Sequence, residues 1–145
     1  MEFAPKTVVQ RKKPVAKKRK ILLVDDEPIA LDILKCMLND EYEIEVAENG
    51  MDALFKVIEF QPEVVLLDAR MPEVDGWEVC KQIKKSRFTD HIKVVMTSAL
   101  AVSDDDRLSG LRAGADFYLP KQCIQRDLLI RILENPAGDL SGLTQ

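Results

Sequence analysis

Apolar residues follow two different patterns along the chain, and the two patterns alternate. Continuous apolar runs occur in KILLV at 20–24, EVVLL at 63–67 and IKVVM at 92–96, and each has the length of one buried strand. EIEVA at 43–47 alternates apolar and acidic residues, as a half-exposed strand would. DFYL at 116–119 is a shorter candidate. Five strands are therefore expected.

Between these strands, apolar residues recur at helical spacing. The expected helices are residues 27–40, 50–60, 77–85, 103–114 and 125–135. Pro28 stands near the start of the first helix, Ser103 is placed to cap the fourth, and Gly114 marks its end. The apolar faces are expected to hold Ile29, Ala30, Ile33, Leu34, Met37 and Leu38 in the first helix and Leu54, Val57 and Ile58 in the second. In the third, Trp77, Cys80, Ile83 and Lys84 share the spacing, with the lysines outward.

Strict alternation of strand and helix predicts an α/β fold. Strands that are apolar on both faces belong to a parallel sheet with helices on both sides. Right-handed crossovers make such a sheet doubly wound, and the common five-stranded order is the flavodoxin-like 2-1-3-4-5.

Charge divides the chain into unequal parts. Residues 1–20 carry eight basic side chains against one glutamate, a net charge of +7, whereas the remaining residues carry 13 basic and 24 acidic side chains, a net charge of -11. We expect a disordered basic arm at 1–19, one folded domain at 20–135 and a flexible tail at 136–145.

Composition excludes several classes of protein. No apolar run approaches the roughly 20 residues of a membrane span, and the basic N-terminal residues lack the apolar block of a secretory signal. Three widely spaced cysteines, with no CxxC and one histidine, do not suit a zinc site or a disulfide framework. A cytoplasmic protein with reduced thiols is expected.

Three carboxylates should meet at one edge of the predicted sheet. The first strand ends at Asp25 and Asp26 and the third at Asp68, and these strands are neighbours at the point where the winding direction changes. Because three like charges a few Å apart repel one another, a hard divalent cation such as Mg²⁺ is expected between them.

Two further groups reach the same crevice. The fourth strand ends at Thr97 and Ser98, and the fifth leads to Lys121. A nucleophilic carboxylate, a metal, a hydroxyl and a lysine together suit the binding and transfer of a phosphoryl group.

These motifs resemble those of the bacterial response regulator receiver domains of two-component, chemotaxis-regulator-like systems. ILLVDDEP is similar to the acidic-pair motif and VVLLDARMPEVDG to the phosphoacceptor motif. VVMTSA and GADFYLPK resemble the motifs of the fourth and fifth strands. The resemblance covers about residues 20–135.

The resemblance implies that Asp68 accepts a phosphoryl group from a sensor histidine kinase or phosphotransfer protein. It places Mg²⁺ on Asp26 directly, on Asp25 through water, and on the backbone carbonyl of Arg70, beside Asp68. The implied protein is a signalling switch and not a metabolic enzyme, with at most slow self-phosphorylation from small phosphodonors and slow dephosphorylation.

The resemblance also assigns the switching residues. Ser98 takes the hydroxyl position, because the small Ala99 follows it; Lys121 contacts the phosphoryl oxygens, and Tyr118 changes rotamer with Ser98. No second domain is recognised after 135, so the output is expected through protein contacts of the face formed by the fourth helix, fifth strand and fifth helix. A phosphorylation-dependent homodimer stays open.

The sequence departs from the family pattern in two places. Proline usually follows the lysine, but Gln122 stands there and Pro120 precedes it; the stretch from Ser98 to Lys121 is also about one residue longer than usual. Since a cis bond without proline costs roughly 2.5–4 kcal/mol, we expect a trans bond at Lys121–Gln122.

Two alternatives compete with this interpretation. A phosphatase of the haloacid dehalogenase type needs Asp-x-Asp on its first strand, and Asp68-Ala69-Arg70 does not supply that motif. The basic arm has the charge for non-specific contacts with nucleic acid, but the domain is acidic and specific nucleic-acid binding is not expected.

Overall fold

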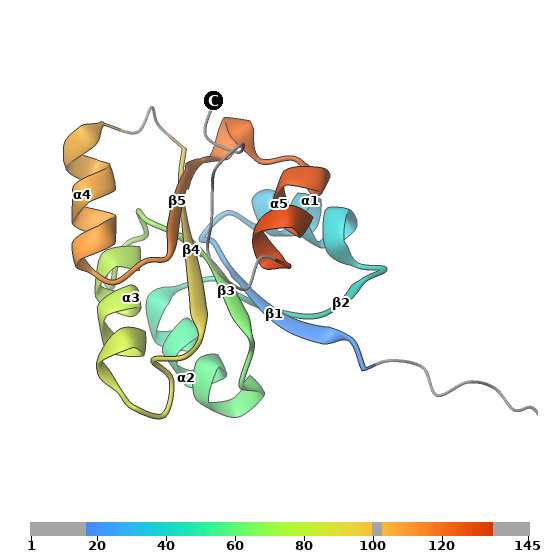
Figure 1. Cartoon of the computed structure of the whole chain (residues 1–145), viewed down its shortest axis with the longest axis horizontal. Helices are drawn as coiled ribbons and strands as arrows, with labels where there is room; N and C mark the ends of the chain where they lie inside the picture. The colour runs from blue at the N-terminus through green and yellow to red at the C-terminus, as the bar shows by residue number, and fades with distance from the viewer. Residues whose placement is uncertain (1–16, 100–102, 135–145) are drawn as a thin grey trace, which may run out of the picture.

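The computed structural model describes residues 17–99 and 103–134. Five strands and five α-helices alternate in these segments (Figure 1). They are β1 (Arg19–Val24), α1 (Pro28–Leu38), β2 (Tyr42–Ala47), α2 (Gly50–Phe60), β3 (Val64–Asp68), α3 (Gly76–Lys85), β4 (Lys93–Ser98), α4 (Asp104–Arg112), β5 (Phe117–Pro120) and α5 (Arg126–Leu133), with a 3-10 turn, η2 (Lys121–Cys123), between the last two.

All neighbouring strands of the sheet are parallel, and their order is β2-β1-β3-β4-β5. The predicted fold class and strand order are confirmed. β1 and β3 are adjacent although α1, β2 and α2 lie between them in sequence, so the winding direction changes there. The strand ends that carry Asp25 and Asp68 therefore lie side by side.

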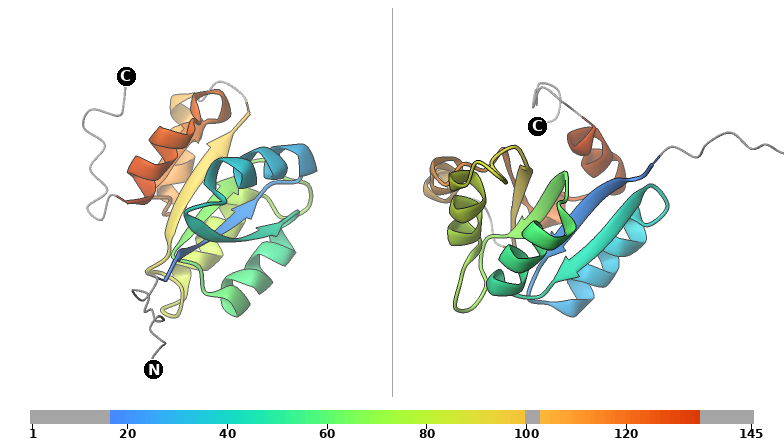
Figure 2. Two further views of the ribbon diagram at one scale, coloured as in Figure 1. Left: turned by 90° about the vertical axis from the view of Figure 1, so that its right-hand side faces the viewer. Right: turned by 90° about the horizontal axis from the view of Figure 1, so that it is seen from below.

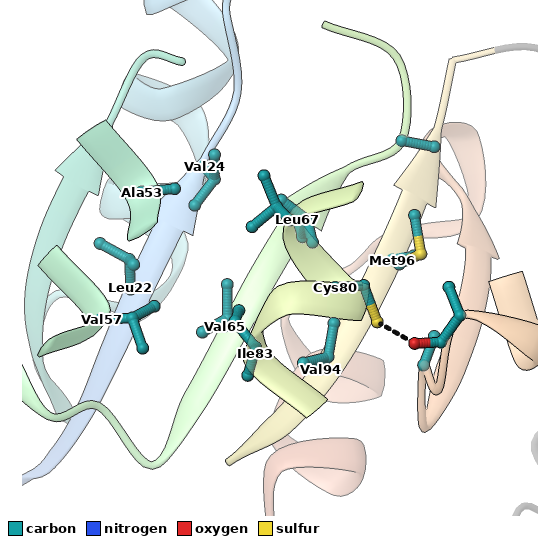
Figure 3. Close-up of a cluster of buried hydrophobic side chains, with 14 of the residues drawn as sticks. Leu22, Val24, Ala53, Val57, Val65, Leu67, Cys80, Ile83, Val94 and Met96 are labelled. Carbon is teal, nitrogen blue, oxygen red and sulfur yellow. Dashed lines mark hydrogen bonds between the residues drawn. The ribbon is translucent and has the colours of Figure 1, made fainter. Parts of the chain in front are cut away.

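Helices cover both faces of the sheet (Figures 1 and 2). One face packs against α1 and α5, with Leu23, Leu66 and Val95 buried under Leu31 and Leu129. The other face packs against α2, α3 and the end of α4. Figure 3 shows this second core, where the Cys80 thiol donates a hydrogen bond to the carbonyl of Ala113 at 3.4 Å. Burial raises the pKa of the Cys80 thiol to about 11, so it stays protonated.

The helix ends follow the sequence signals closely. Ser103 caps α4 by accepting a hydrogen bond from the backbone N–H of Asp106, and the acidic run lies in the first turn of that helix. Asn49 and Asp75 cap α2 and α3 in the same way. Gly114 follows α4 with φ +100°, a left-handed conformation that glycine adopts most easily. Each N-cap fixes the residue at which its helix begins, and Gly114 marks the end of α4.

The predicted apolar faces are only partly buried, and one predicted side-chain direction was wrong. Ile29 and Ile33 of α1 and Ile58 of α2 are exposed, whereas Leu38 and Val57 of the same predicted faces are buried. Lys84 does not point outward: its ammonium donates to the carbonyl of Ile92 at 2.7 Å and pairs with Asp116 at 3.0 Å. Its aliphatic stem also lies where a side chain on Gly114 would stand.

The structure describes only some of the residues at the expected domain limits. β1 begins at Arg19, one residue before the expected boundary at residue 20. Most of the predicted arm at 1–19, Asn135 and the predicted tail at 136–145 lie outside the described residues. None of the described helices has both the length and the apolar character needed to cross a membrane.

Candidate functional site

Three aspartates meet where β1 and β3 end. One carboxylate oxygen from each of Asp25, Asp26 and Asp68 lies within 4.8 Å of the others. Asp25 and Asp68 are buried, with 1% and 5% of their surface exposed, while Asp26 is exposed. The juxtaposition predicted from the sequence is present, and two of the three charges are removed from water.

Lys121 enters the same crevice from the end of β5. Its ammonium lies 2.6 Å from Oδ2 of Asp25 and 3.6 Å from Oδ2 of Asp68. Burial lowers the pKa of this lysine, but the hydrogen bond to Asp25 and the charge of Asp68 outweigh that effect and raise it. Lys121 is therefore a firmly charged partner for both buried carboxylates.

The Lys121–Gln122 bond is trans, because no peptide bond in the described residues is cis. Lys121 opens the short η2 turn, and the backbone N–H of Ile124 donates to its carbonyl at 3.0 Å. The expectation of a trans bond with the amine still inside the crevice is confirmed.

Asp68 is held in an unfavourable position for a charge. Burial and the nearby charge of Asp25 raise its pKa from 3.8 to about 6, although Lys121 and the backbone N–H of Arg70 offset part of the rise. That N–H is 3.4 Å from Oδ1 of Asp68, which is a long hydrogen bond. A single lysine thus leaves the carboxylates undercompensated, and the set of oxygen donors fits a hard divalent cation.

Gly76 allows the loop after Asp68 to fold back tightly. A Cβ at this position would stand 2.2 Å from the carbonyl oxygen of Asp68, too close for any side chain. The Gly76 N–H donates to the carbonyl of Ala69 at 2.9 Å, and the Ala69 N–H donates to Thr97 at 2.8 Å. These contacts fix the path of the backbone after Asp68 and so the position of Arg70 relative to the carboxylates.

Thr97 and Ser98 end β4 beside Asp68, and both are buried. They stand on successive positions of one strand, so their side chains leave it on opposite faces. Thr97 helps line the cavity under α1, which leaves Ser98 on the side of α4. The role of Ser98 as the hydroxyl of the site stays a prediction.

Tyr118 is buried on β5, with its ring against α4. A Cβ on Gly110 would stand 2.3 Å from Cδ2 of this ring, so the glycine makes the space that the ring occupies. Burial raises the pKa of Tyr118 and the neighbouring Ser98 partly offsets the rise, yet the hydroxyl completes no hydrogen bond within the described residues. The ring is buried, and its hydroxyl has no hydrogen-bond partner among residues 17–99 and 103–134.

Arg70 links the loop after Asp68 to α4. Its guanidinium lies 3.5 Å from Oδ1 of Asp106, in the first turn of α4, and 5.4 Å from the centre of the Trp77 ring. The sequence had suggested a role for the Arg70 carbonyl only. Its side chain could not be placed from spacing, because Asp106 lies 36 residues further along the chain.

An apolar cavity of about 270 Å³ adjoins the carboxylates. Its apolar lining consists of Ala30, Ile33, Leu34 and Met37 of α1 and Ile124, and its polar lining residues are Asp25, Thr97 and Lys121. The sequence interpretation used the apolar residues of α1 only to identify a helix and did not predict the cavity. Apolar residues on two sides of α1 were the available signal.

Comparison with known proteins agrees with this site. The family model described as "Response regulator receiver domain" matches residues 21–133. The chain therefore belongs to the response regulator receiver domain family, whose members are phosphorylatable switches of two-component signalling and not metabolic enzymes. Such domains interact with histidine kinases and phosphotransfer proteins, and they generally bind Mg²⁺.

Three solved structures show the likeness in detail. The CheY-like receiver domain protein of Methanospirillum hungatei is 33% identical, with a TM-score of 0.73 over 81% of this chain and 93% of that one. The BeF3-activated receiver domain of DrrB, a Thermotoga maritima protein, is 30% identical with a TM-score of 0.71, covering 82% and 100%. The chemotaxis protein CheY4 of Vibrio cholerae is 26% identical with a TM-score of 0.75, covering 81% and 98%.

Proposed function

We propose that Asp68 accepts a phosphoryl group from a phosphohistidine of a sensor histidine kinase or phosphotransfer protein. An Asp68 oxygen attacks phosphorus, the bond from phosphorus to the imidazole nitrogen breaks, and the imidazole takes up a proton. The observation that carries the proposal is the meeting of three carboxylates and Lys121 at one strand edge. With a pKa of about 6, Asp68 is mostly ionised at neutral pH and able to act as a nucleophile.

Asp26, Asp25 and the carbonyl of Arg70 would hold Mg²⁺ beside Asp68. The fit rests on an excess of carboxylate charge that Lys121 alone does not balance. When bound, Mg²⁺ supplies charge neutralisation for the phosphoryl oxygens.

Lys121 and Ser98 would contact the other phosphoryl oxygens. Lys121 already stands between Asp25 and Asp68, so a small movement of its ammonium would bring it to a phosphoryl group on Asp68. Ser98 is buried at the neighbouring strand end and has a hydroxyl to donate. Both contacts gain strength because the site excludes much of the surrounding water.

The switched surface would be the face formed by α4, β5 and α5. Tyr118 lies under this face, its hydroxyl has no hydrogen-bond partner in the part of the chain that the structure describes, and Arg70 connects the loop after Asp68 to α4. A change at Ser98 or in that loop would therefore alter α4 and the Tyr118 ring together. A phosphorylation-dependent homodimer through this face, and a cytoplasmic location, remain predictions.

The cavity beside Lys121 suits the approach of the phosphodonor protein. Its lining is mostly apolar and includes Asp25 and Lys121, so an apolar side chain near the donor histidine could anchor there. Ile29 and Ile33 extend this apolar surface along α1.

Incubation with a small phosphodonor and Mg²⁺, followed by intact mass measurement, tests the proposal. The full chain should gain one phosphate, and the gain should be lost with a chelator or with Asp68→Asn. Asp116→Asn is the matched control, since Asp116 lies at the far end of the sheet, and it should be phosphorylated normally. Stoichiometric phosphorylation of the Asp68→Asn variant would refute the proposal.

A further inference from the structure

The outer face of α2 carries an apolar stripe that no described residue covers. Met51, Phe55 and Ile58 are 64%, 62% and 58% exposed. Positions four and three residues apart lie on one face of a helix, so these three side chains form one surface, which we call the α2 stripe. Large apolar side chains exposed together mark a site of interaction.

The segment that contains α2 is strongly acidic. Residues 43–63 hold six acidic side chains and one basic, a net charge of -5. The acids are Glu43, Glu45, Glu48, Asp52, Glu59 and Glu63. The single base, Lys56, is occupied locally: it donates to the carbonyl of Val46 at 2.5 Å and lies 3.5 Å from Asp52. A segment that covers this surface should therefore be both apolar and basic.

The chain itself contains such a segment. Residues 1–16 lie outside the described part of the chain and include four basic side chains, Lys6, Arg11, Lys12 and Lys13, and the apolar residues Met1, Phe3, Val8 and Val9. With Glu2 counted, residues 1–16 carry a net charge of +3, and the adjoining Lys17 and Lys18 raise it to +5. This segment therefore complements the surface around the α2 stripe in both charge and apolar character.

Two residues at the start of β1 contact the end of α2. Lys20 donates to the carbonyl of Phe60 at 3.2 Å and stands 5.1 Å from the centre of its ring. Arg19 pairs with Glu63 at 2.8 Å. Sixteen residues can span up to roughly 50 Å when extended, whereas an 11-residue helix such as α2 is about 16 Å long. The arm therefore starts beside α2 and is long enough to cover it.

We infer that residues 1–16 dock on the α2 stripe of the same chain. The contact joins the basic side chains of the arm to the acids of residues 43–63 and its apolar side chains to Met51, Phe55 and Ile58. Because the arm is tethered, its effective concentration is on the order of mM, so a weak contact is enough to keep it docked. Salt screens the charges and releases the arm, which then becomes available to anionic partners.

Methyl NMR of the full chain provides the test. With labelled methionine methyl groups and a soluble relaxation agent, the Met51 methyl should be protected at low salt and become accessible at high salt. Neutralising the arm with K6Q, R11Q, K12Q and K13Q should expose Met51 at low salt as well. The matched control neutralises four cations elsewhere, with K81Q, K85Q, R87Q and R112Q, and should leave Met51 protected.

Two results would overturn the inference. An accessible Met51 methyl in the unmodified chain at low salt would show that the arm does not cover the stripe. Protection that disappears on dilution would show that a second copy, and not the same chain, covers it. Protection that is independent of protein concentration and lost in the arm variant is the result we expect.

Discussion

At the scale of single residues, the site is a balance between buried carboxylates and one lysine. Asp25 and Asp68 are almost removed from water, and Lys121 is shared between them. The site therefore holds negative charge where burial disfavours it, and this arrangement favours the binding of cations. The free-energy cost of the buried charge predicts how the stability of the protein should respond to pH and to substitution.

Asp68→Asn should stabilise the protein at neutral pH in the presence of a chelator. The Asp68 pKa is raised from 3.8 to about 6, so the folded chain binds this proton more tightly than the unfolded chain. The penalty is absent below pH 3.8, grows as pH rises and is complete above about 6. The shift corresponds to about 3 kcal/mol at most. Urea denaturation across this range should show a gain for the variant that vanishes in acid; equal stability at neutral pH would contradict it.

Lys121→Gln should raise the pKa of Asp68 further, because the lysine now lowers it. Lys84→Gln is a matched control, since the two lysine side chains are 22% and 19% exposed but Lys84 pairs with Asp116 instead. Carboxyl-carbon NMR titration without metal measures the change directly. An Asp68 pKa that moves equally in both variants, or in neither, would count against the assigned role of Lys121.

The sequence predicted most of this site and missed specific parts of it. Asp25, Asp26, Asp68 and Lys121 follow strand ends, and parallel strands bring their carboxyl ends together, so their meeting could be inferred. The contact of Gly110 with Tyr118 depends on how α4 packs on β5, and spacing along the chain contains no such information. The sequence interpretation placed Lys84 outward because spacing along the chain did not reveal its contact with Asp116.

At the scale of elements, α4 is the helix most weakly fixed by apolar packing. Gly110 is its only buried residue, and the exposed Leu108 and Leu111 contribute little to the core. Among the described residues, the Arg70–Asp106 pair also holds it, and Ser103 caps its start. Such a helix can move without disrupting the sheet, which suits the proposed output face.

Gly110→Ala should displace the Tyr118 ring. Its Cβ would lie 2.3 Å from Cδ2 of Tyr118, so the ring must move outward or α4 must shift. We expect a loss of about 1–3 kcal/mol from overpacking, although alanine favours helix by about 1 kcal/mol. Ser109→Ala, at an exposed neighbouring position, should be neutral or slightly stabilising. Denaturation and acrylamide quenching of labelled Tyr118 measure both effects, and a more stable variant with an inward ring would contradict this account.

The helices also show where patterns mislead. α1 has apolar residues on most of its circumference, so periodicity could not decide which of them enter the core. The structure buries Leu31 and Leu38 and leaves Ile29 and Ile33 outside, because the sheet accepts only one face of the helix. The predicted cap and end of α4, in contrast, depend on local bonds, and they were correct.

At the scale of the whole molecule, the strand order 2-1-3-4-5 was predictable because few topologies satisfy right-handed crossovers. The N-terminal boundary of the fold was not predictable, because Arg19 is charged and its sequence context is that of the basic arm. In the structure its guanidinium donates to Glu63 at 2.8 Å and to the carbonyl of Leu133 at 2.9 Å. It thereby connects the start of β1 to the end of α5.

Arg19→Ala should cost about 1 kcal/mol of stability, because its hydrogen bonds are charge-assisted but half exposed. Lys18→Ala is the control for loss of one basic side chain, and thermal denaturation measures both variants.

Deletion of residues 1–16 retains Arg19 and should leave phosphorylation of Asp68 unchanged. Intact mass after phosphorylation checks this expectation, and loss of phosphorylation in the truncated chain would contradict the independence of arm and site.

The central claim is that Asp68 itself carries the phosphoryl group. Reduction of the phosphorylated protein with labelled borohydride converts an acyl phosphate into a tagged homoserine, and peptide mass mapping then identifies the residue. The account predicts a single tag at Asp68 that appears only when phosphodonor and Mg²⁺ are both present. A tag at Asp25 or Asp26, or a stable phosphate on another residue with Asp68 unmodified, would contradict it.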